Sequence, residues 1–336
     1  MTNAIFILGA GFNVDASTNM SGTTYSYPIV KDLAQKCFGM LEPLTDKSIE
    51  QLFQEAMDEK RSEPFQCLYH LLMEADNYIG QELTTKSISP ISPYRLLLEH
   101  FPNSHFLTFN YDALLEMLLF SLGRWRPDYG YGIPVHAELE NLVAKPTLPE
   151  KSNNLVLHLH GTFCVYPAEF YLKQNGRSFI EWITPLYPPQ FMFDPDSIVH
   201  RFFPFRRAFP CPSYEYPYQR VIAPMPSKAP ELTRPFIKST YTAALDHVAR
   251  ADTAVAIGYR FGEYDIESYK PILRTIADRS LRLVIVSPSA NIIAASLKYG
   301  FGIRSTPIAI GFRDWALRGF PLPNPGEQKR TERNLA

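Results

Sequence analysis

The sequence is poor in the features that mark several large classes of protein. Its 336 residues carry a formal net charge of -1, so the charge balance favours neither a nucleic acid nor an anionic membrane surface as a partner. Only four cysteines are present, and no two of them form a Cys-x-x-Cys pair. Because structural zinc sites and disulfide frameworks need closely spaced cysteines, we expect neither a metal nor a disulfide core.

Long apolar runs are also missing. The apolar stretch 4–12 is too short to span a bilayer, and no basic leader precedes it. We therefore expect a cytoplasmic protein without a membrane segment. The stretch is better interpreted as a first strand that runs into a turn containing Gly9 and Gly11.

This glycine turn has only part of the dinucleotide-binding fingerprint. Glycines between a strand and a helix let the backbone approach a diphosphate, while the free N–H groups of the helix face the anion. The full fingerprint has a third glycine where this chain has Val14, and an acid after the second strand that we do not find. A phosphate-binding loop and a turn that serves only close packing are therefore equal alternatives.

The chain is organised around the stretch 104–116. Its first half is a short apolar run and its second half consists of helix formers, with Asn110, Tyr111 and Asp112 between them. Ligands of open α/β sheets bind where the chain leaves the carboxyl end of a strand, so these side chains are well placed for chemistry. The alternative is that Asn110 or Asp112 only caps the following helix.

A later strand ends in two histidines. The run 155–161 places His158 and His160 on the same face, with His160 and Gly161 at the carboxyl end. Histidine transfers protons near neutral pH, so His160 is a candidate base. We interpret His158 as a satisfied core histidine.

Strands and helices alternate again after residue 236. Apolar strands are predicted at 253–259, ending at Gly258 and Tyr259, and at 281–286, followed by Ser287, with an edge strand at 305–310. Nearly continuous apolar strands separated by helices predict a parallel sheet that is covered on both faces. The predicted fold class is α/β, Rossmann-like.

Two segments interrupt this alternation. Residues 26–100 have apolar side chains at helical spacing and predict a helical insertion. Residues 162–234 are rich in proline and aromatic residues, which predicts an ordered arm packed on its own domain or on a neighbouring chain. Its run 201–207 mixes cations with aromatics, and we favour a solvated arm there over a contact for a partner chain or a single strand. We predict one domain over 1–320 and a polar tail over 321–336.

Taken together, the strand ends resemble the sirtuin-like superfamily, and more closely its bacterial branch of NAD-hydrolysing defence proteins than its protein deacylases. The resemblance extends over about 260 residues and leaves both insertions unexplained. The matching elements are Gly9-Ala10-Gly11, Thr108-x-Asn110-Tyr111-Asp112, Leu159-His160-Gly161, and Ile257-Gly258-Tyr259 followed by Glu263-Tyr264-Asp265.

The resemblance implies that NAD is the substrate, while the scattered cysteines predict that no metal takes part. It implies that Asn110 holds the nicotinamide ribose and the attacking water, that Asp112 lies near the carboxamide, and that His160 is the base. The remaining NAD-binding positions would be Gly9, Ala10, Gly11, Phe12 and Asn13 at the diphosphate, Gly161, and Gly258, Tyr259 and Ser287 along the adenosine half. The family more often has serine where Asn13 stands, and Asp15 adds a carboxylate close by.

Three functions are consistent with the sequence. The first is an NAD glycohydrolase of antiphage defence, kept silent until a partner or assembly activates it, so we expect a homo-oligomer or a partner such as a motor ATPase or a sensor subunit. The second is an NAD-dependent protein deacylase, but such enzymes carry a four-cysteine zinc module after the histidine, where this chain has only Cys164 and Cys211. The third is a nucleotide-binding scaffold without turnover.

Overall fold

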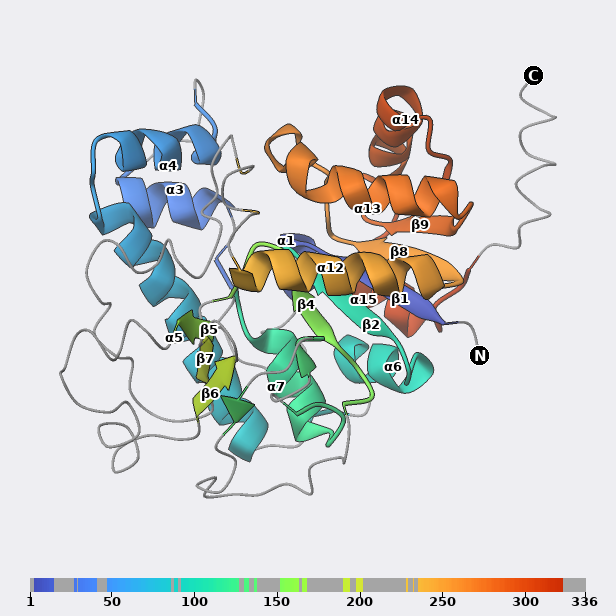
Figure 1. Cartoon of the computed structure of the whole chain (residues 1–336), viewed down its shortest axis with the longest axis horizontal. Helices are drawn as coiled ribbons and strands as arrows, with labels where there is room; N and C mark the ends of the chain where they lie inside the picture. Colours follow the sequence, from blue (N-terminus) through green and yellow to red (C-terminus); the bar gives the residue numbers. More distant parts are fainter. Residues whose placement is uncertain are drawn as a thin grey trace.

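A six-stranded parallel sheet forms the centre of the molecule (Figure 1). The computed structural model describes residues 3–14, 27–28, 30–40, 47–85, 88–89, 92–126, 130–132, 136–137, 152–162, 165–167, 190–193, 198–201, 228, 232 and 235–322. The strands of the sheet are β1 (Ala4–Leu8), β2 (His105–Thr108), β4 (Val156–His158), β8 (Thr253–Ile257), β9 (Arg282–Val286) and β10 (Ser305–Ile308).

The order of the strands is that of Rossmann folds. Across the sheet it is β10-β9-β8-β1-β2-β4, and each neighbouring pair is parallel. The chain therefore starts at the centre, builds one half outward to β4, and returns to build the other half from β8 to β10. Every residue of β1 and β8 is buried, because helices cover both faces, and this explains their continuous apolar sequences.

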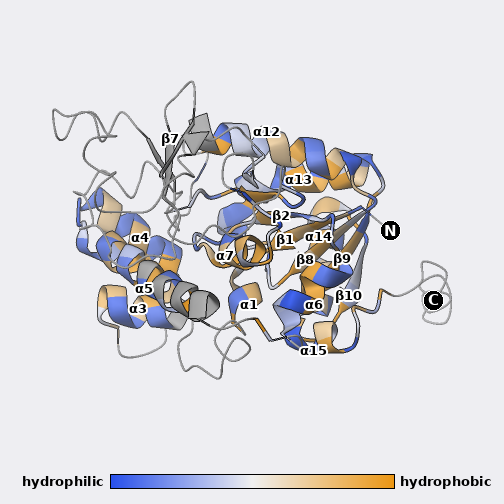
Figure 2. Cartoon of the chain, turned by 90° about the horizontal axis from the view of Figure 1, so that it is seen from below, coloured by the Kyte–Doolittle hydropathy of each residue, from blue (hydrophilic) through white to orange (hydrophobic). Residues whose placement is uncertain are grey.

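Helices lie on both sides of the sheet. In Figure 2, α12 (Pro235–Arg250) and α13 (Ile266–Asp278) lie on one side, and α6 (Pro93–His100) and α15 (Phe312–Leu317) lie on the other. The helix α14 (Ala290–Phe301) contacts β9 and β10 and ends at Gly302, which has the left-handed conformation that glycine adopts readily. The predicted α/β, Rossmann-like fold with a parallel sheet is confirmed.

The segment between β1 and β2 is helical. It contains α3 (Val30–Phe38), α4 (Ile49–Asp58) and the long α5 (Glu63–Thr85), which pack on one another before α6. A capping box formed by Ser48 and Gln51 starts α4, and its buried Phe53 packs against neighbouring aromatic rings. Cys37 and Cys67 are free thiols on α3 and α5, with their Sγ atoms 2.8 Å apart. The predicted helices are present, while the division of the chain into domains stays a prediction.

A second sheet, which the sequence did not indicate, lies apart from the first. The strands β3 (His136–Ala137), β5 (Val165–Pro167), β6 (Gln190–Phe193) and β7 (Ile198–Arg201) pair antiparallel in the order β3-β6-β7-β5. Most of the predicted arm 162–234, including the run after Arg201 and the cysteines Cys164 and Cys211, lies outside the described residues. Asp15 and the tail after residue 322 lie outside them as well. In the described part of the chain, no helix is long and apolar enough to cross a membrane.

Two turns touch at the centre of the sheet. A methyl group added to Gly9 would lie 2.8 Å from the carbonyl oxygen of Gly258, and one added to Gly11 would lie 2.8 Å from the Gly258 Cα atom. Gly258 itself has a φ of +61°, a conformation that side chains rarely allow. These positions therefore require glycine because the turn after β1 and the turn after β8 approach each other backbone to backbone.

Replacing Gly258 by alanine should destabilise the fold strongly. The new methyl group would lie 2.4 Å from the carbonyl carbon of Gly11, in a strained backbone conformation. We expect the free energy of unfolding, measured by urea denaturation, to fall by about 2–4 kcal/mol. The control is Gly262→Ala, because a methyl group there meets nothing within 4 Å and φ is -62°. Equal stability of the two variants would contradict the contact between the turns.

Candidate active site

Most of the sequence-predicted site residues gather at one edge of the sheet. The strands β8, β1, β2 and β4 are parallel neighbours, so the residues that follow them share the carboxyl edge. These are Gly258 and Tyr259 after β8, Gly9 to Asn13 after β1, Asn110 to Asp112 after β2, and His160 after β4. The order of the strands reverses between β1 and β8, which is where open α/β sheets bind ligands. Ser287 follows β9, further along the edge, and its N–H donates to the Ile308 carbonyl.

Asn110 is bonded across the edge of the sheet rather than to the helix that follows. Its Nδ2 donates to the carbonyl oxygen of Gly9 and to Oδ1 of Asn13, both at 3.2 Å. Its own backbone N–H donates to Thr108 Oγ1 at 3.0 Å, which fixes the turn after β2. Asn110 is partly exposed and does not cap α7 (Leu114–Ser121), so helix capping, the alternative that the sequence left open, does not explain this residue.

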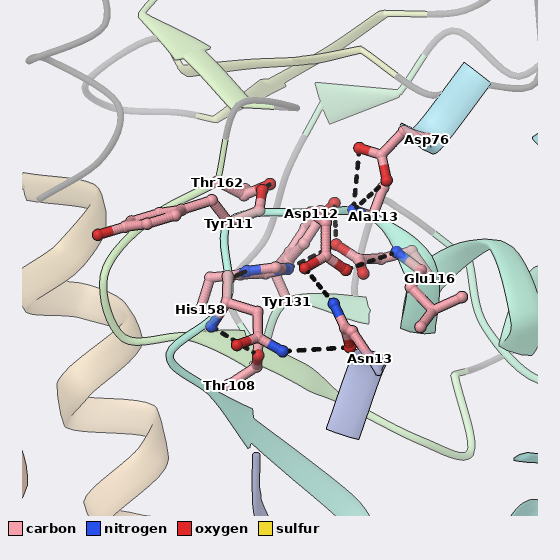
Figure 3. A network of polar contacts seen from close by, with 12 residues as sticks. Asn13, Asp76, Thr108, Tyr111, Asp112, Ala113, Glu116, Tyr131, His158 and Thr162 are labelled. Atoms are coloured by element: carbon pink, nitrogen blue, oxygen red, sulfur yellow. Dashed lines mark hydrogen bonds and ion pairs between the residues drawn. The ribbon is translucent and has the colours of Figure 1, made fainter. Parts of the chain in front are cut away.

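Asp112, in contrast, does bond the start of α7. Its Oδ1 accepts the N–H of Leu114 at 3.1 Å, and its Oδ2 accepts Nδ2 of Asn13 at 2.6 Å (Figure 3). Burial raises the pKa of this carboxyl to about 6, although the hydrogen bond from the Leu114 N–H favours the ionised form and lowers the pKa. Asp112 thus has a capping contact and also titrates just below neutral pH.

Asn13 joins the two residues. It is buried in the short helix α1 (Ala10–Asn13), and its amide accepts from Asn110 and donates to Asp112. The sequence suggested a diphosphate contact for Asn13, whereas in the structure its side chain bridges two residues after β2. The side chain of Phe12 is buried against Tyr94 and Phe312.

The glycine turn uses its own N–H groups inside the protein. Gly9 donates to the carbonyl of Ile257 and Gly11 to that of Gly258, both at 3.1 Å, and Phe12 donates back to Gly9 at 2.9 Å. Close packing of the turns after β1 and β8 therefore explains these glycines in this conformation. The histidine strand β4 ends at His158, earlier than predicted, so His160 and Gly161 lie in the turn that follows it and the predicted alternation does not reach His160. Gly161 has a φ of +77° and donates to the carbonyl of His158.

His158 is buried beneath Asn110 and paired with an acid. Its Nε2 lies 2.6 Å from Glu116 Oε1 (Figure 3), and its Nδ1 lies 3.0 Å from the Asn110 carbonyl oxygen. Burial alone would lower the pKa of His158, but the charge and hydrogen bond of Glu116 outweigh it and raise the pKa above its usual value. The sequence predicted a satisfied core histidine, and the structure gives its partner.

A further carboxyl group, Asp76, reaches the site from the helical segment. It lies on α5, is 1% exposed, and accepts the N–H of Ala113 with both oxygens, at 3.1 and 3.2 Å. It also accepts the hydroxyl of Tyr27 at 2.6 Å. Burial, helped by the charge of Asp112, raises its pKa well above the ordinary value. Sequence reasoning missed Asp76, because an acid inside a helical pattern gives no sign that it is buried.

His160 lies on the other side of the Asn110 turn. It is 3% exposed, its Nε2 is 3.1 Å from Ser268 Oγ, and its ring packs edge-on against Phe109. Burial lowers the pKa of His160 to about 3, so the imidazole is neutral at neutral pH. Its nitrogen can then accept a hydrogen bond or a proton, although it is a weak base.

An aromatic pair covers the middle of the edge. Phe109 follows β2 and Tyr259 follows β8, and their rings stack at 4.1 Å with an angle of 5° between the planes. Because β1 lies between β2 and β8, the two rings meet above the end of β1. The described residues contain no group of three or more His, Cys, Asp or Glu side chains arranged to hold a metal ion.

Comparison with known proteins gives structural similarity only. No protein-family model matches the chain, and no curated protein matches it. A structure reported for the mechanism and regulation of Sir2 enzymes is similar with a TM-score of 0.41 and 14% identity, covering 98% of this chain and 93% of the other. A second, on sirtuin substrate affinity, has a TM-score of 0.38 and 14% identity, with 94% and 92% covered. At such low scores no residue role is transferred, and the fold assignment rests on the order of the strands.

The Glu116 and His158 pair should be strongly coupled in stability. Both side chains are 1% exposed, so removing either one leaves the other buried without its ion-pair partner. We expect Glu116→Gln and His158→Gln each to lower the free energy of unfolding by about 3 kcal/mol or more, and the double variant to lose much less than the sum. Additive losses in urea denaturation would show that the two groups act independently.

The same pair should give a defined pH dependence. The folded-state pKa of His158 is raised above 6.5, so its contribution to stability is full below the unfolded value and is lost as the pH rises through the folded value. The stability difference between the wild type and Glu116→Gln should therefore be larger at about pH 6 than at about pH 9. A difference that grows with pH would contradict the charged pair.

Proposed function

We propose that this protein is an NAD glycohydrolase that releases nicotinamide and ADP-ribose. The observation that carries the proposal is the Asn110 amide, held 3.2 Å from both the Gly9 carbonyl and Asn13 beside the reversal of strand order, with His160 following the next strand. Asp112 completes the group through Asn13. A neutral amide, a carboxyl and a neutral imidazole suit a reaction that needs positioning, control of water and one base.

The chemistry makes modest demands on the protein. The bond between the anomeric carbon and the pyridinium nitrogen breaks, and its electron pair stays with nicotinamide, which leaves as a neutral molecule. Water adds to the anomeric carbon and loses a proton. Asn110 orients this water without carrying charge, His160 accepts the proton, and Asp112 faces the carboxamide of nicotinamide. No strong acid is required.

The residues fit the nicotinamide end of NAD better than its diphosphate. The N–H groups of Gly9, Gly11 and Phe12 are bonded within the protein, so they are not offered to an anion in this conformation. Binding of the diphosphate through these N–H groups would require the turn after β1 to separate from Gly258.

This closed arrangement suits an enzyme that is silent until it is activated. His160 is 3% exposed, and NAD depletion without control would harm the cell that makes the protein. We therefore extend the proposal to an effector of prokaryotic antiphage defence that is switched on by assembly into a homo-oligomer, or by a partner such as a motor ATPase or a sensor subunit. Activity assays should accordingly include the proteins encoded beside it.

Replacing Asn110 should separate catalysis from binding. Because the amide acts on the transition state more than on bound NAD, Asn110→Ala should still bind NAD by calorimetry, while nicotinamide release, measured by chromatography, falls by about 100-fold or more. Asn110→Asp should be inactive as well, since a carboxylate lacks the donor that bonds Gly9. Unchanged turnover would place the chemistry elsewhere. Binding without turnover in the activated wild type would favour a scaffold.

Replacing His160 should abolish nicotinamide release under activating conditions. Loss of a general base typically costs about 100-fold or more, and His160→Ala should retain the circular dichroism spectrum of the wild type. The control is His100→Ala, because His100 is exposed at the end of α6, near the amino end of β2. Equal activity in His160→Ala and the wild type would exclude His160 as the proton acceptor.

A further inference from the structure

Asp265 lies where several polar groups around His160 meet. It is the last residue of the short helix η2 (Glu263–Asp265), and its side chain is 23% exposed. Its Oδ1 lies 3.8 Å from His160 Nε2 and forms an ion pair with the Lys228 ammonium. Its Oδ2 accepts the hydroxyl of Tyr259 at 3.2 Å. One carboxylate thus connects the end of β4, the turn after β8 and the segment that precedes α12.

Lys228 is buried to a degree that is rare for lysine. It is 2% exposed, and a buried ammonium is tolerated only beside compensating groups. Asp265 provides the opposite charge, and Glu267 Oε2 accepts the backbone N–H of Lys228 at 2.8 Å. Lys228 is therefore anchored twice, once through its side chain and once through its backbone, to residues just before and within α13.

Ser268 is a further polar neighbour of His160. Its side chain is fully buried, with Oγ 3.1 Å from His160 Nε2, and its backbone carbonyl accepts the hydroxyl of Tyr241 at 2.9 Å. The Nε2 atom thus has a hydroxyl at hydrogen-bonding distance and the carboxylate of Asp265 just beyond it. Asp265 can reach the imidazole after a small movement.

The charges near His160 oppose each other. Burial lowers the pKa of His160, Lys228 lowers it further, and Asp265 acts in the opposite direction. Burial would raise the pKa of Asp265, but His160 and Lys228 hold it below its usual value, so the carboxyl stays ionised. Burial also raises the pKa of the Tyr111, Tyr241 and Tyr259 phenols nearby, which remain neutral. Glu267 faces the backbone of Lys228.

We propose that Asp265 is a positioning residue for His160, and that Lys228, by occupying Asp265, adds to burial in keeping this histidine uncharged. This inference rests on the proposed function, in which His160 accepts the proton of the attacking water. Once His160 is protonated, Asp265 is the carboxylate that stabilises the imidazolium. A partner or an assembly step that draws Lys228 away from Asp265 makes His160 a stronger base, which gives the silent enzyme a route to activation.

The first test needs no NAD. Histidine side chains are followed by NMR as the pH is varied, and the His160 signal is identified by its absence in His160→Gln. In Lys228→Met the pKa of His160 should rise by about one to three units over the wild type, because Asp265 loses its cation and pairs with the imidazole. In the double variant Lys228→Met, Asp265→Asn the rise should disappear, which a purely structural role for Asp265 does not predict.

The controls keep the test decisive. Glu263→Gln changes an exposed acid on the same short helix and should leave the His160 titration unchanged. Lys228→Gln is made alongside Lys228→Met, since its amide can still hydrogen-bond Asp265 if the apolar variant does not fold. An unaltered His160 pKa in the folded Lys228 variants, or the same rise in the double variant, would overturn the proposal.

The second test uses turnover. Asp265→Asn should lower kcat for nicotinamide release by about 10-fold or more with little change in KM, because the imidazolium loses its stabilising charge. Lys228→Met should release nicotinamide without the activator, or should need less activator than the wild type. If the NMR shifts occur but no variant releases nicotinamide, the coupling of Asp265, Lys228 and His160 stands and the NAD glycohydrolase proposal fails.

Discussion

The backbone contact between the turns after β1 and β8 determines the geometry of the whole carboxyl edge. Gly9 and Gly11 approach Gly258 so closely that a single Cβ atom on any of them would collide with backbone. The contact lies at the point where the order of the strands reverses, directly beyond the paired strands β1 and β8. It also positions the Gly9 carbonyl oxygen, which accepts a hydrogen bond from the Asn110 amide. The position of the central amide of the site therefore depends on residues without side chains.

Around this contact, polar groups are arranged in two buried clusters with opposite electrostatic character. On one side of the Asn110 turn lie Asp76, Asp112 and Glu116 with His158, and burial there favours bound protons on the carboxyls of Asp76 and Asp112. On the other side, burial and Lys228 keep His160 free of its proton. Environments that push the pKa values of neighbouring titratable groups apart in this way are typical of sites that hold an acid and a base.

Local patterns in the sequence predicted the parts of the site that lie at strand ends. Asn110, Asp112 and His160 follow short apolar strands, and parallel strands bring such residues to one edge. The partners of these residues were not predictable, because they come from distant parts of the chain. Asp76 meets Ala113 across 37 residues, and Lys228 meets Asp265 across 37 residues. The small antiparallel sheet was missed because prolines obscure strand periodicity, and the Gly9 turn was ambiguous because packing and phosphate binding both select glycine.

The hydrogen bonds of Asp76 change how the helical segment between β1 and β2 should be regarded. The backbone N–H of Ala113, next to Asp112, has its acceptor on α5 and not on the sheet. The same carboxyl holds the hydroxyl of Tyr27, at the start of the segment. The helical segment is thus bonded to the turn after β2 and does not simply pack on the outside of the Rossmann-like sheet. A shortened chain without it would lose the acceptor of the Ala113 N–H, so the turn after β2 depends on the helical segment as well as on the sheet.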